Sequence, residues 1–214
     1  MSDKFNFNTV KNFDAHIESS IQNYDTMHDQ VIKFASYFIN DSTNVVDIGC
    51  STGKTLSILA PQYPNSNFIG IDESDLIPHK SLENLEFFKM DIVDTDIFNS
   101  SLILSLFTLQ FLSPKKREQT INLVKKGLNK GGAFICCEKI HSETAIMQSA
   151  MDSIYYEFKG MSFNDNEILL KQRQLRRSLR LKTLNELITE LSDIGKVEIF
   201  WKSLNFVGIV VIKD

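Results

Sequence analysis

Two glycines and three acidic residues carry the clearest chemical signal in this sequence. Gly49 and Gly53 bracket a short loop that follows an apolar run. Three acids, Asp47, Asp72 and Asp91, lie where three successive apolar runs end. The backbone N–H groups of such a loop, and the N-terminus of a helix behind it, favour negative or polar ligand groups. A carboxylate can accept hydrogen bonds from two neighbouring hydroxyls, so the pattern predicts a site for a nucleoside-like ligand.

Spacing separates the ligand classes that use a loop of this kind. A phosphate-binding P-loop needs four residues between its glycines, and only three separate Gly49 from Gly53, although Lys54 follows as it would in that motif. The dinucleotide fingerprint G-x-G-x-x-G needs a glycine at the position of Ser51. Both alternatives are therefore disfavoured.

The segment 45–53 resembles the first motif of class I methyltransferases, which bind S-adenosylmethionine (SAM). The resemblance implies that Asp47 orients the loop. It also implies contacts to the methionine part of SAM from loop residues Gly49, Cys50, Ser51 and Gly53, to the ribose from Asp72 and Glu73, and to the adenine from Asp91 and Ile92. Asp72 lies about 20 residues beyond the loop, which is where a ribose-binding acid is expected.

A closer resemblance, from Phe7 to Lys213, is to the carboxy-SAM synthases and their relatives. It is carried by the segments 19–24, 107–112, 127–133, 138–139, 158–159 and 205–206. In that family the enzyme removes a proton from the methyl carbon of SAM and traps a carboxylate released from prephenate. The product, carboxy-SAM, serves the modification of the wobble uridine of certain tRNAs. The resemblance implies the same activity, and a homodimer, for this chain.

The same resemblance assigns further roles. Tyr24 is expected to contact the ligand, and Arg173 is the candidate for binding the added carboxylate, although a shift of one residue would put Gln172 there. A guanidinium suits this role because it can hold a carboxylate through two charge-assisted hydrogen bonds. Leu106 stands where the family has a ligand-contacting asparagine, and Phe163 stands where it has a tyrosine.

Two other functions are compatible with a SAM site. The first is a conventional methyltransferase acting on a small molecule or on RNA, which would work mainly by aligning the acceptor with the sulfonium methyl group. The second is a SAM-binding protein without turnover. The four arginines that share one helical face fit a solvated surface, an RNA phosphate patch, a pocket for an anionic substrate or a contact to a neighbouring subunit's site: Arg173, Arg176, Arg177 and Arg180.

The elements that must position these residues follow from hydrophobic periodicity. Strands are predicted at 44–48, 67–72, 85–90, 101–107, 133–137, 197–201 and 206–213. Helices are predicted within 1–24, where Val10, Phe13, Ile17 and Ile21 share one face, and at 25–39, 54–61, 114–128, 142–158 and 166–194. This alternation predicts an α/β, Rossmann-like fold of the class I methyltransferase type, with a seven-stranded, mostly parallel sheet, helices on both faces and a terminal hairpin. We expect one domain over 1–214, with a helical extension at 1–40 and a helical substrate region at 141–195.

Composition narrows the function classes further. The net charge of −4 lacks the broad basic excess of a dedicated nucleic-acid binder. The sequence has no apolar stretch of about 18 residues, so no membrane span is expected. The three cysteines lack both a disulfide framework and zinc-ligand spacing, and no metal is expected. Together with a polar N-terminus, these features predict a cytoplasmic enzyme.

Overall fold

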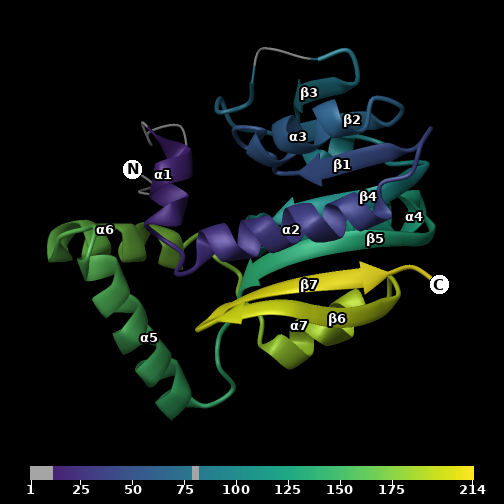
Figure 1. Cartoon of the computed structure of the whole chain (residues 1–214). Coiled ribbons are helices and arrows are strands. Elements are labelled where there is room, and N and C mark those ends of the chain that lie inside the picture. Colours follow the sequence, from purple (N-terminus) through teal and green to yellow (C-terminus); the bar gives the residue numbers. More distant parts are fainter. Residues whose placement is uncertain (1–11, 79–81) are drawn as a thin grey trace.

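A twisted sheet of seven strands organises the chain (Figure 1). The computed structural model describes residues 12–78 and 82–214. Its strands are β1 (Asn44–Ile48), β2 (Asn67–Asp72), β3 (Leu85–Lys89), β4 (Ser100–Leu106), β5 (Leu128–Lys139), β6 (Lys196–Ser203) and β7 (Phe206–Ile212). They lie in the order β3-β2-β1-β4-β5-β7-β6, and β7 runs antiparallel to both of its neighbours. The predicted mostly parallel sheet with a terminal hairpin is confirmed.

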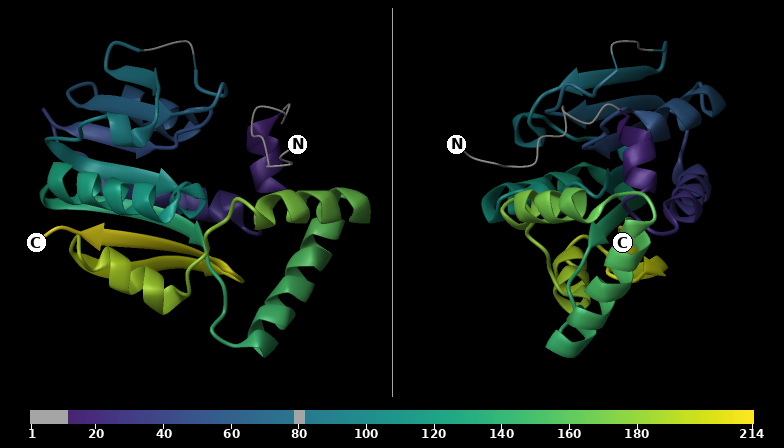
Figure 2. Two further views of the ribbon diagram at one scale, coloured as in Figure 1. Left: turned by 180° about the vertical axis from the view of Figure 1, so that it is seen from behind. Right: turned by 90° about the vertical axis from the view of Figure 1, so that its left-hand side faces the viewer.

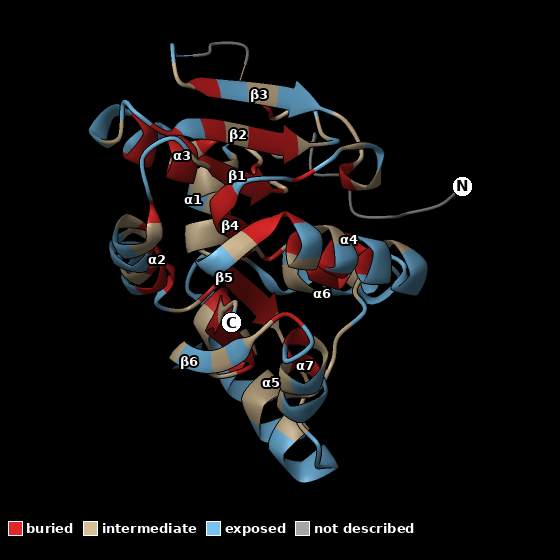
Figure 3. Cartoon of the chain, turned by 90° about the vertical axis from the view of Figure 1, so that its right-hand side faces the viewer, coloured by how far each residue is buried: buried red, intermediate tan, exposed pale blue. Residues whose placement is uncertain are grey.

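Helices cover both faces of the sheet, as predicted. The helices are α1 (Phe13–Glu18), α2 (Tyr24–Phe38), α3 (Lys54–Leu59), α4 (Pro114–Gly127), α5 (Ala145–Gly160), α6 (Asp165–Arg176) and α7 (Leu184–Leu191). Alternate side chains of each central strand enter opposite core layers, because successive residues of a strand point to opposite faces. Val45 packs with α2 and α3, whereas Val46 packs with α4 and α7. Figure 3 shows the buried residues concentrated in the strands and on the inner faces of the helices.

The prediction of one continuous helix over 166–194 is wrong. The structure has two helices, α6 and α7, joined by a segment that lies against the sheet end. In that segment the Arg180 N–H donates to Gln110 O, and Lys182 O accepts from the His141 N–H. Each helix begins with a capping box, at Asn164 and at Thr183, so the chain starts helix formation twice.

Two further boundaries differ from the predictions. Strand β5 begins at Leu128, five residues earlier than expected, because the chain passes through Gly131 at a φ of +74° and stays paired with β4 across a register shift. The predicted first helix is the short α1, and the part of that prediction that falls before residue 12 lies outside the described residues.

The C-terminal ends of the parallel strands meet at one edge of the sheet. Helices α1 and α6 lie at this edge, while α5 projects beyond it (Figures 1 and 2). Within the described ranges, no helix is both long enough and apolar enough to cross a membrane. Loops at this edge of an open α/β sheet are the usual place for a ligand site.

Candidate functional site

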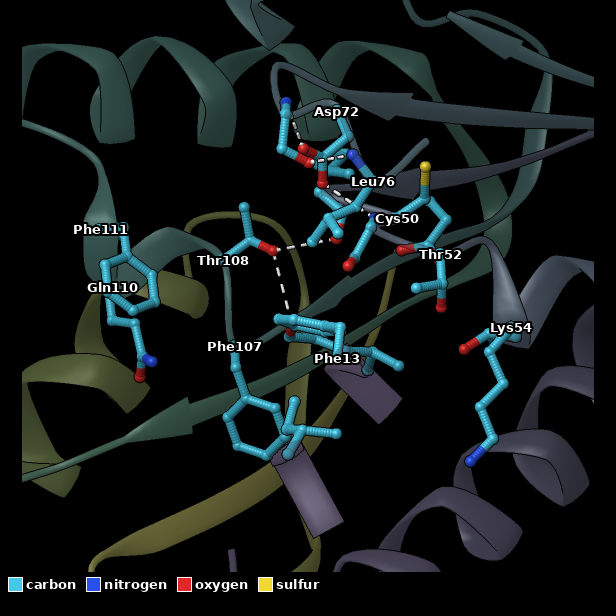
Figure 4. Close-up of a pocket in the computed structure, with 18 of the residues that line it drawn as sticks. Phe13, Cys50, Thr52, Lys54, Asp72, Leu76, Phe107, Thr108, Gln110 and Phe111 are labelled. Carbon is cyan, nitrogen blue, oxygen red and sulfur yellow. Dashed lines mark hydrogen bonds between the residues drawn. The ribbon is translucent and has the colours of Figure 1, made fainter. Parts of the chain in front are cut away.

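A cavity of about 270 Å³ lies at the C-terminal edge of the sheet (Figure 4). Most of the residues that the sequence predicts for ligand binding line this cavity: Tyr24, Asp47, Gly49, Cys50, Ser51, Asp72, Glu73, Asp91, Ile92 and Leu106. The topology brings them together because β1, β2, β3 and β4 are adjacent and parallel. Gly53 and Arg173 do not line the cavity. No group of three or more His, Cys, Asp or Glu in the described residues is arranged to hold a metal ion.

The glycine loop turns sharply between β1 and α3. Gly49 and Gly53 have φ angles of +75° and +68°, a region that side chains rarely adopt. Thr108, from the segment after β4, packs against Gly49 so closely that an added Cβ would lie 2.1 Å from its Oγ1. A Cβ at Gly53 would lie 2.5 Å from the Phe87 ring. Both glycines therefore shape the loop, and Gly53 acts as the N-cap of α3.

Asp72 ends β2 and faces the loop. Its Oδ2 accepts a hydrogen bond from the Ser51 N–H at 2.8 Å, and its Oδ1 accepts one from the Ser74 N–H at 2.8 Å. These two bonds fix the carboxylate at the cavity wall (Figure 4). A carboxylate has about four acceptor sites, so both oxygens retain capacity for ligand hydroxyl groups.

Asp91 follows β3, where it both caps a turn and lines the cavity. It is the N-cap of a single 3₁₀ turn and accepts from the Val93 N–H. Its other oxygen pairs with Lys116 of α4. Burial would raise the pKa of Asp91, but the hydrogen bonds from Lys116 and Val93 prevail and lower it. Asp91 is therefore ionised at neutral pH, beside Ile92, which supplies apolar cover.

Asp47 lies beneath the loop and is 3% exposed. Burial, and secondarily the charge of Asp72, raises the pKa of Asp47 to about 7. Within the described residues, neither its Oδ1 nor the buried Oγ of Ser51 has a hydrogen-bond partner. Buried polar atoms are nearly always paired in proteins, so these two atoms are suited to a ligand donor.

The N-terminal helices close the other side of the cavity. Tyr24, at the start of α2, is 8% exposed and stacks on His28. Helix α1 is attached to the glycine loop at two points: Thr52 Oγ1 donates to Asp14 at 2.9 Å, and Lys54 pairs with Glu18 at 2.9 Å. A ligand in the loop would therefore also be covered by α1.

Glu138, near the end of β5, is occupied in a buried ion pair. Its Oε2 lies 2.8 Å from Arg117 Nη1, and its Oε1 accepts from the Gln110 N–H. Arg117 also contacts Glu190 at 2.8 Å. Glu138 does not line the cavity, so its contacts hold the end of β5 in place.

Arg173 lies on the exposed side of α6. The same helix presents Lys171 and Leu175 to the cavity, and these residues are four positions apart, as one helical face requires. Arg173 is two positions from each and therefore points away. Sequence reasoning gave no role to Lys171, nor to Lys139, which also lines the cavity. A charged residue at the end of the buried strand β5 is a signal that could have found Lys139.

Comparisons with known proteins agree with this geometry. A family profile described as a methyltransferase domain matches residues 45–132. The plantazolicin methyltransferase BpumL, solved with a plantazolicin analogue and S-adenosylhomocysteine, superposes with a TM-score of 0.65 at 16% identity, covering 93% of this chain and 86% of that one. The YcgJ protein of Bacillus subtilis gives a TM-score of 0.62 at 14% identity, covering 89% and 99%. The chain has the class I methyltransferase fold and is a SAM-dependent transferase.

Sequence comparison identifies the family more narrowly. The carboxy-S-adenosyl-L-methionine synthase of Staphylococcus epidermidis is 35% identical over 96% of this chain and 94% of its own length. Enzymes of the same name from Shewanella baltica and Pseudoalteromonas atlantica are 32% and 28% identical over 94% and 99% of this chain, and 88% and 93% of their own lengths. The chain belongs to the carboxy-S-adenosyl-L-methionine synthase family.

Proposed function

We propose that this chain converts SAM into carboxy-SAM. The observation that carries the proposal is the 35% identity, over 96% of the chain, to a relative named for that product. In the reaction, a C–H bond of the sulfonium methyl group breaks and its electron pair forms a C–C bond to carbon dioxide lost from prephenate. The proton combines with the hydroxide that prephenate also loses as its ring becomes aromatic, which leaves phenylpyruvate and water.

The cavity supports SAM binding by residues of this chain. Asp47 Oδ1 and Ser51 Oγ are available to the ammonium group of the methionine part, since they have no partner within the described residues. Asp72 would accept from the ribose hydroxyls, and Asp91 from the adenine amino group, with Ile92 against the ring. Tyr24 would cover the ligand from α2. SAM supplies the methyl carbon, and these residues hold it and exclude water.

Helices α5 and α6 support a homodimer. These helices and Met161, directly after α5, present six large apolar side chains with exposures from 43% to 83%: Ile146, Met147, Ile154, Met161, Leu169 and Leu170. An exposed apolar face on a projecting helix is typical of an interface, and we assign it to a second copy of this chain. Arg173, on the exposed side of α6, would then be available to the partner's cavity. Sedimentation analysis tests this proposal: Ile154→Asp should yield monomer, whereas Ile199→Asp on the exposed edge of β6 should not.

The wider role proposed for the chain is the supply of carboxy-SAM for tRNA wobble-uridine modification in the cytoplasm. The three cysteines are free and buried, which suits a reducing compartment. Residues 141–195, which include α5 and α6, are proposed as the substrate region of one SAM-binding domain. The exposed arginines of α6 are the feature that supports RNA binding by this chain.

One experiment tests the proposed reaction. The purified protein is denatured, the released ligand is identified by mass spectrometry, and the native protein is incubated with SAM and prephenate. Carboxy-SAM in either sample supports the proposal. SAM or S-adenosylhomocysteine alone, with no turnover of prephenate, would contradict carboxylation, and the absence of any adenosyl ligand, in the sample and in calorimetry, would contradict the SAM site.

A conventional methyltransferase is the second candidate, and a specific observation favours it. Leu106 lines the cavity where the family has asparagine, and the expected Arg173 is absent from the cavity of its own chain. Arg173→Ala separates the candidates. Selective loss of carboxy-SAM retention, with SAM binding intact, would support carboxylation with an arginine from the partner.

A further inference from the structure

Three lysines lie close to one another beside the cavity. Lys139 ends β5, Lys159 lies near the end of α5, and Lys171 lies on α6. Lys139 and Lys171 line the cavity, and Lys159 is only 4% exposed. The three lysines come from three different elements, β5, α5 and α6, which Figure 1 labels.

Aromatic rings hold two of these ammonium groups close together. Lys139 Nζ lies 4.5 Å from the centroid of the Tyr155 ring, and Lys159 Nζ lies 5.7 Å from the same centroid. Lys159 Nζ is also 4.9 Å from the centre of the Phe163 ring. Cation–π contacts of this kind position a lysine without neutralising its charge.

Lys171 joins the cluster through His16 of α1 and through Ser20, which follows that helix. Its Nζ donates to Ser20 Oγ at 3.2 Å and contacts the His16 ring. Ser20 O in turn accepts from the Tyr155 hydroxyl at 3.0 Å. The ring that supports Lys139 and Lys159 is thus connected to the residue that holds Lys171.

Two of the three lysines, Lys139 and Lys159, have no ion-pair partner among the described residues. Asp152 of α5 is the carboxylate whose charge acts on Lys139, and it also accepts a hydrogen bond from Gln148. Buried charges in proteins are normally paired, so the ammonium groups of Lys139 and Lys159, without a carboxylate partner beside a cavity, indicate an anionic ligand.

The ionisation of the cluster agrees with this imbalance. Burial, followed by repulsion from the neighbouring lysines, lowers the pKa of Lys159 to about 8 and that of Lys171 to about 7. His16 faces Lys171, and burial and the two lysines lower its pKa to about 4. An anion bound among these groups would favour their protonated forms, so its affinity should fall as the pH rises above about 7.

The cluster is well placed relative to SAM. Strand β4 separates β5 from β1, and neighbouring strands lie about 4.8 Å apart, so Lys139 is on the order of 10 Å from the glycine loop across the sheet. Building on the proposed function, we propose that Lys139 and Lys171 bind the carboxylate groups of a dianionic carboxyl donor beside the sulfonium methyl group, with the buried positive charge of Lys159 behind them. The donor's charge would offset both the lysines and the sulfonium.

Calorimetry tests the site without turnover. Prephenate is titrated into the full-length protein saturated with S-adenosylhomocysteine, which lacks the transferred carbon, and malonate is titrated in parallel as a dicarboxylate that cannot react. Lys139→Met and Lys171→Met should each weaken prephenate binding by about 10-fold or more, since a hydrogen bond to a charged group contributes that much. The control Lys126→Met, an exposed residue of α4, should change nothing.

Two results would overturn the site. The first is an equal loss of S-adenosylhomocysteine affinity in the lysine variants, which would mean that the cluster holds the methionine carboxylate of SAM. The second is unchanged prephenate and malonate binding in variants that melt cooperatively. Loss of folding is not expected, because methionine removes a buried charge and keeps the length of the apolar stem.

Failure of the site is distinguishable from failure of the proposed reaction. Lysine-dependent malonate and prephenate binding without any carboxy-SAM formation would contradict the reaction and support the site. Carboxy-SAM formation with an unchanged KM for prephenate in both lysine variants would support the reaction and contradict the site.

Discussion

Replacing Arg117 by methionine should strongly destabilise the protein, because it removes the positive partner of the buried Glu138 carboxyl group. The side chains of Arg117 and Glu138 are 4% and 3% exposed, and the two groups lie 2.8 Å apart. Removing one partner of such a pair typically costs about 3–5 kcal/mol. At about 2–4 °C per kcal/mol for a chain of this size, the melting temperature should fall by roughly 6–20 °C. Glu190 is less affected, because it is 20% exposed and keeps Lys182 at 3.3 Å.

The assay is thermal unfolding followed by circular dichroism, with Lys126→Met of the same helix as the control. The double variant Arg117→Met/Glu138→Gln should recover at least about half of the loss, since no buried charge remains and the glutamine can still accept from the Gln110 N–H. Lowering the pH should also narrow the gap between Arg117→Met and the wild type. Burial already raises the pKa of Glu138, and without Arg117 the folded state takes up a proton more readily than the unfolded chain. A loss no larger than that of the control, or a double variant less stable than the single one, would refute this reasoning.

Three further outcomes are expected. Asp72→Asn should weaken S-adenosylhomocysteine binding by about 10-fold or more in calorimetry, through lost charge-assisted hydrogen bonds, and unchanged affinity would exclude Asp72 from the ribose site. Gly49→Ala should lower the melting temperature, since the left-handed backbone alone costs about 1–2 kcal/mol and the new Cβ would meet Thr108, whereas Gly160→Ala, with open space around it, should not. Lys171→Met should raise the free energy of unfolding most below a pH of about 7. Burial lowers the pKa of Lys171 from 10.5 to about 7 in the folded protein, so the charged lysine destabilises the fold at low pH, and the gain from removing it should shrink as the pH rises toward 10.5. A gain that grew with pH would contradict that depressed pKa.

The strand pattern was predictable because the sheet is buried on both faces. Runs such as 44–48 and 101–107 carry enough apolar residues to show a strand without any tertiary information. The acids at successive strand ends then had to meet, since parallel strands share their C-terminal edge. This is why Asp47, Asp72 and Asp91 could be placed near one another before the structure was known.

The division between α6 and α7 was harder to predict, because the intervening segment is held by long-range contacts. Its backbone groups pair with Gln110 and His141, which are distant in sequence, and helical periodicity does not register such contacts. The sequence does contain a local signal for the start of α7. The pattern Thr183-x-x-Glu186 is a capping box, and the side-chain and backbone hydrogen bonds of that motif are both present.

Arg173, the candidate for binding the added carboxylate, shows why sequence resemblance alone is a weak guide to the role of a residue on a helix. Each residue of an α-helix turns the side chain by about 100°, so a shift of one position moves a functional group to another face. In α6 the cavity side is defined by Lys171 and Leu175, and neither Arg173 nor Gln172 shares it. Within the described part of one chain, the lysines that line the cavity are Lys54, which pairs with Glu18 of α1, Lys171 of α6 and Lys139 of β5. An arginine could enter only from a second copy. The calorimetric test of the lysines and the Arg173→Ala test consequently report on different subunits, and agreement between them would mean that the site is completed by two chains.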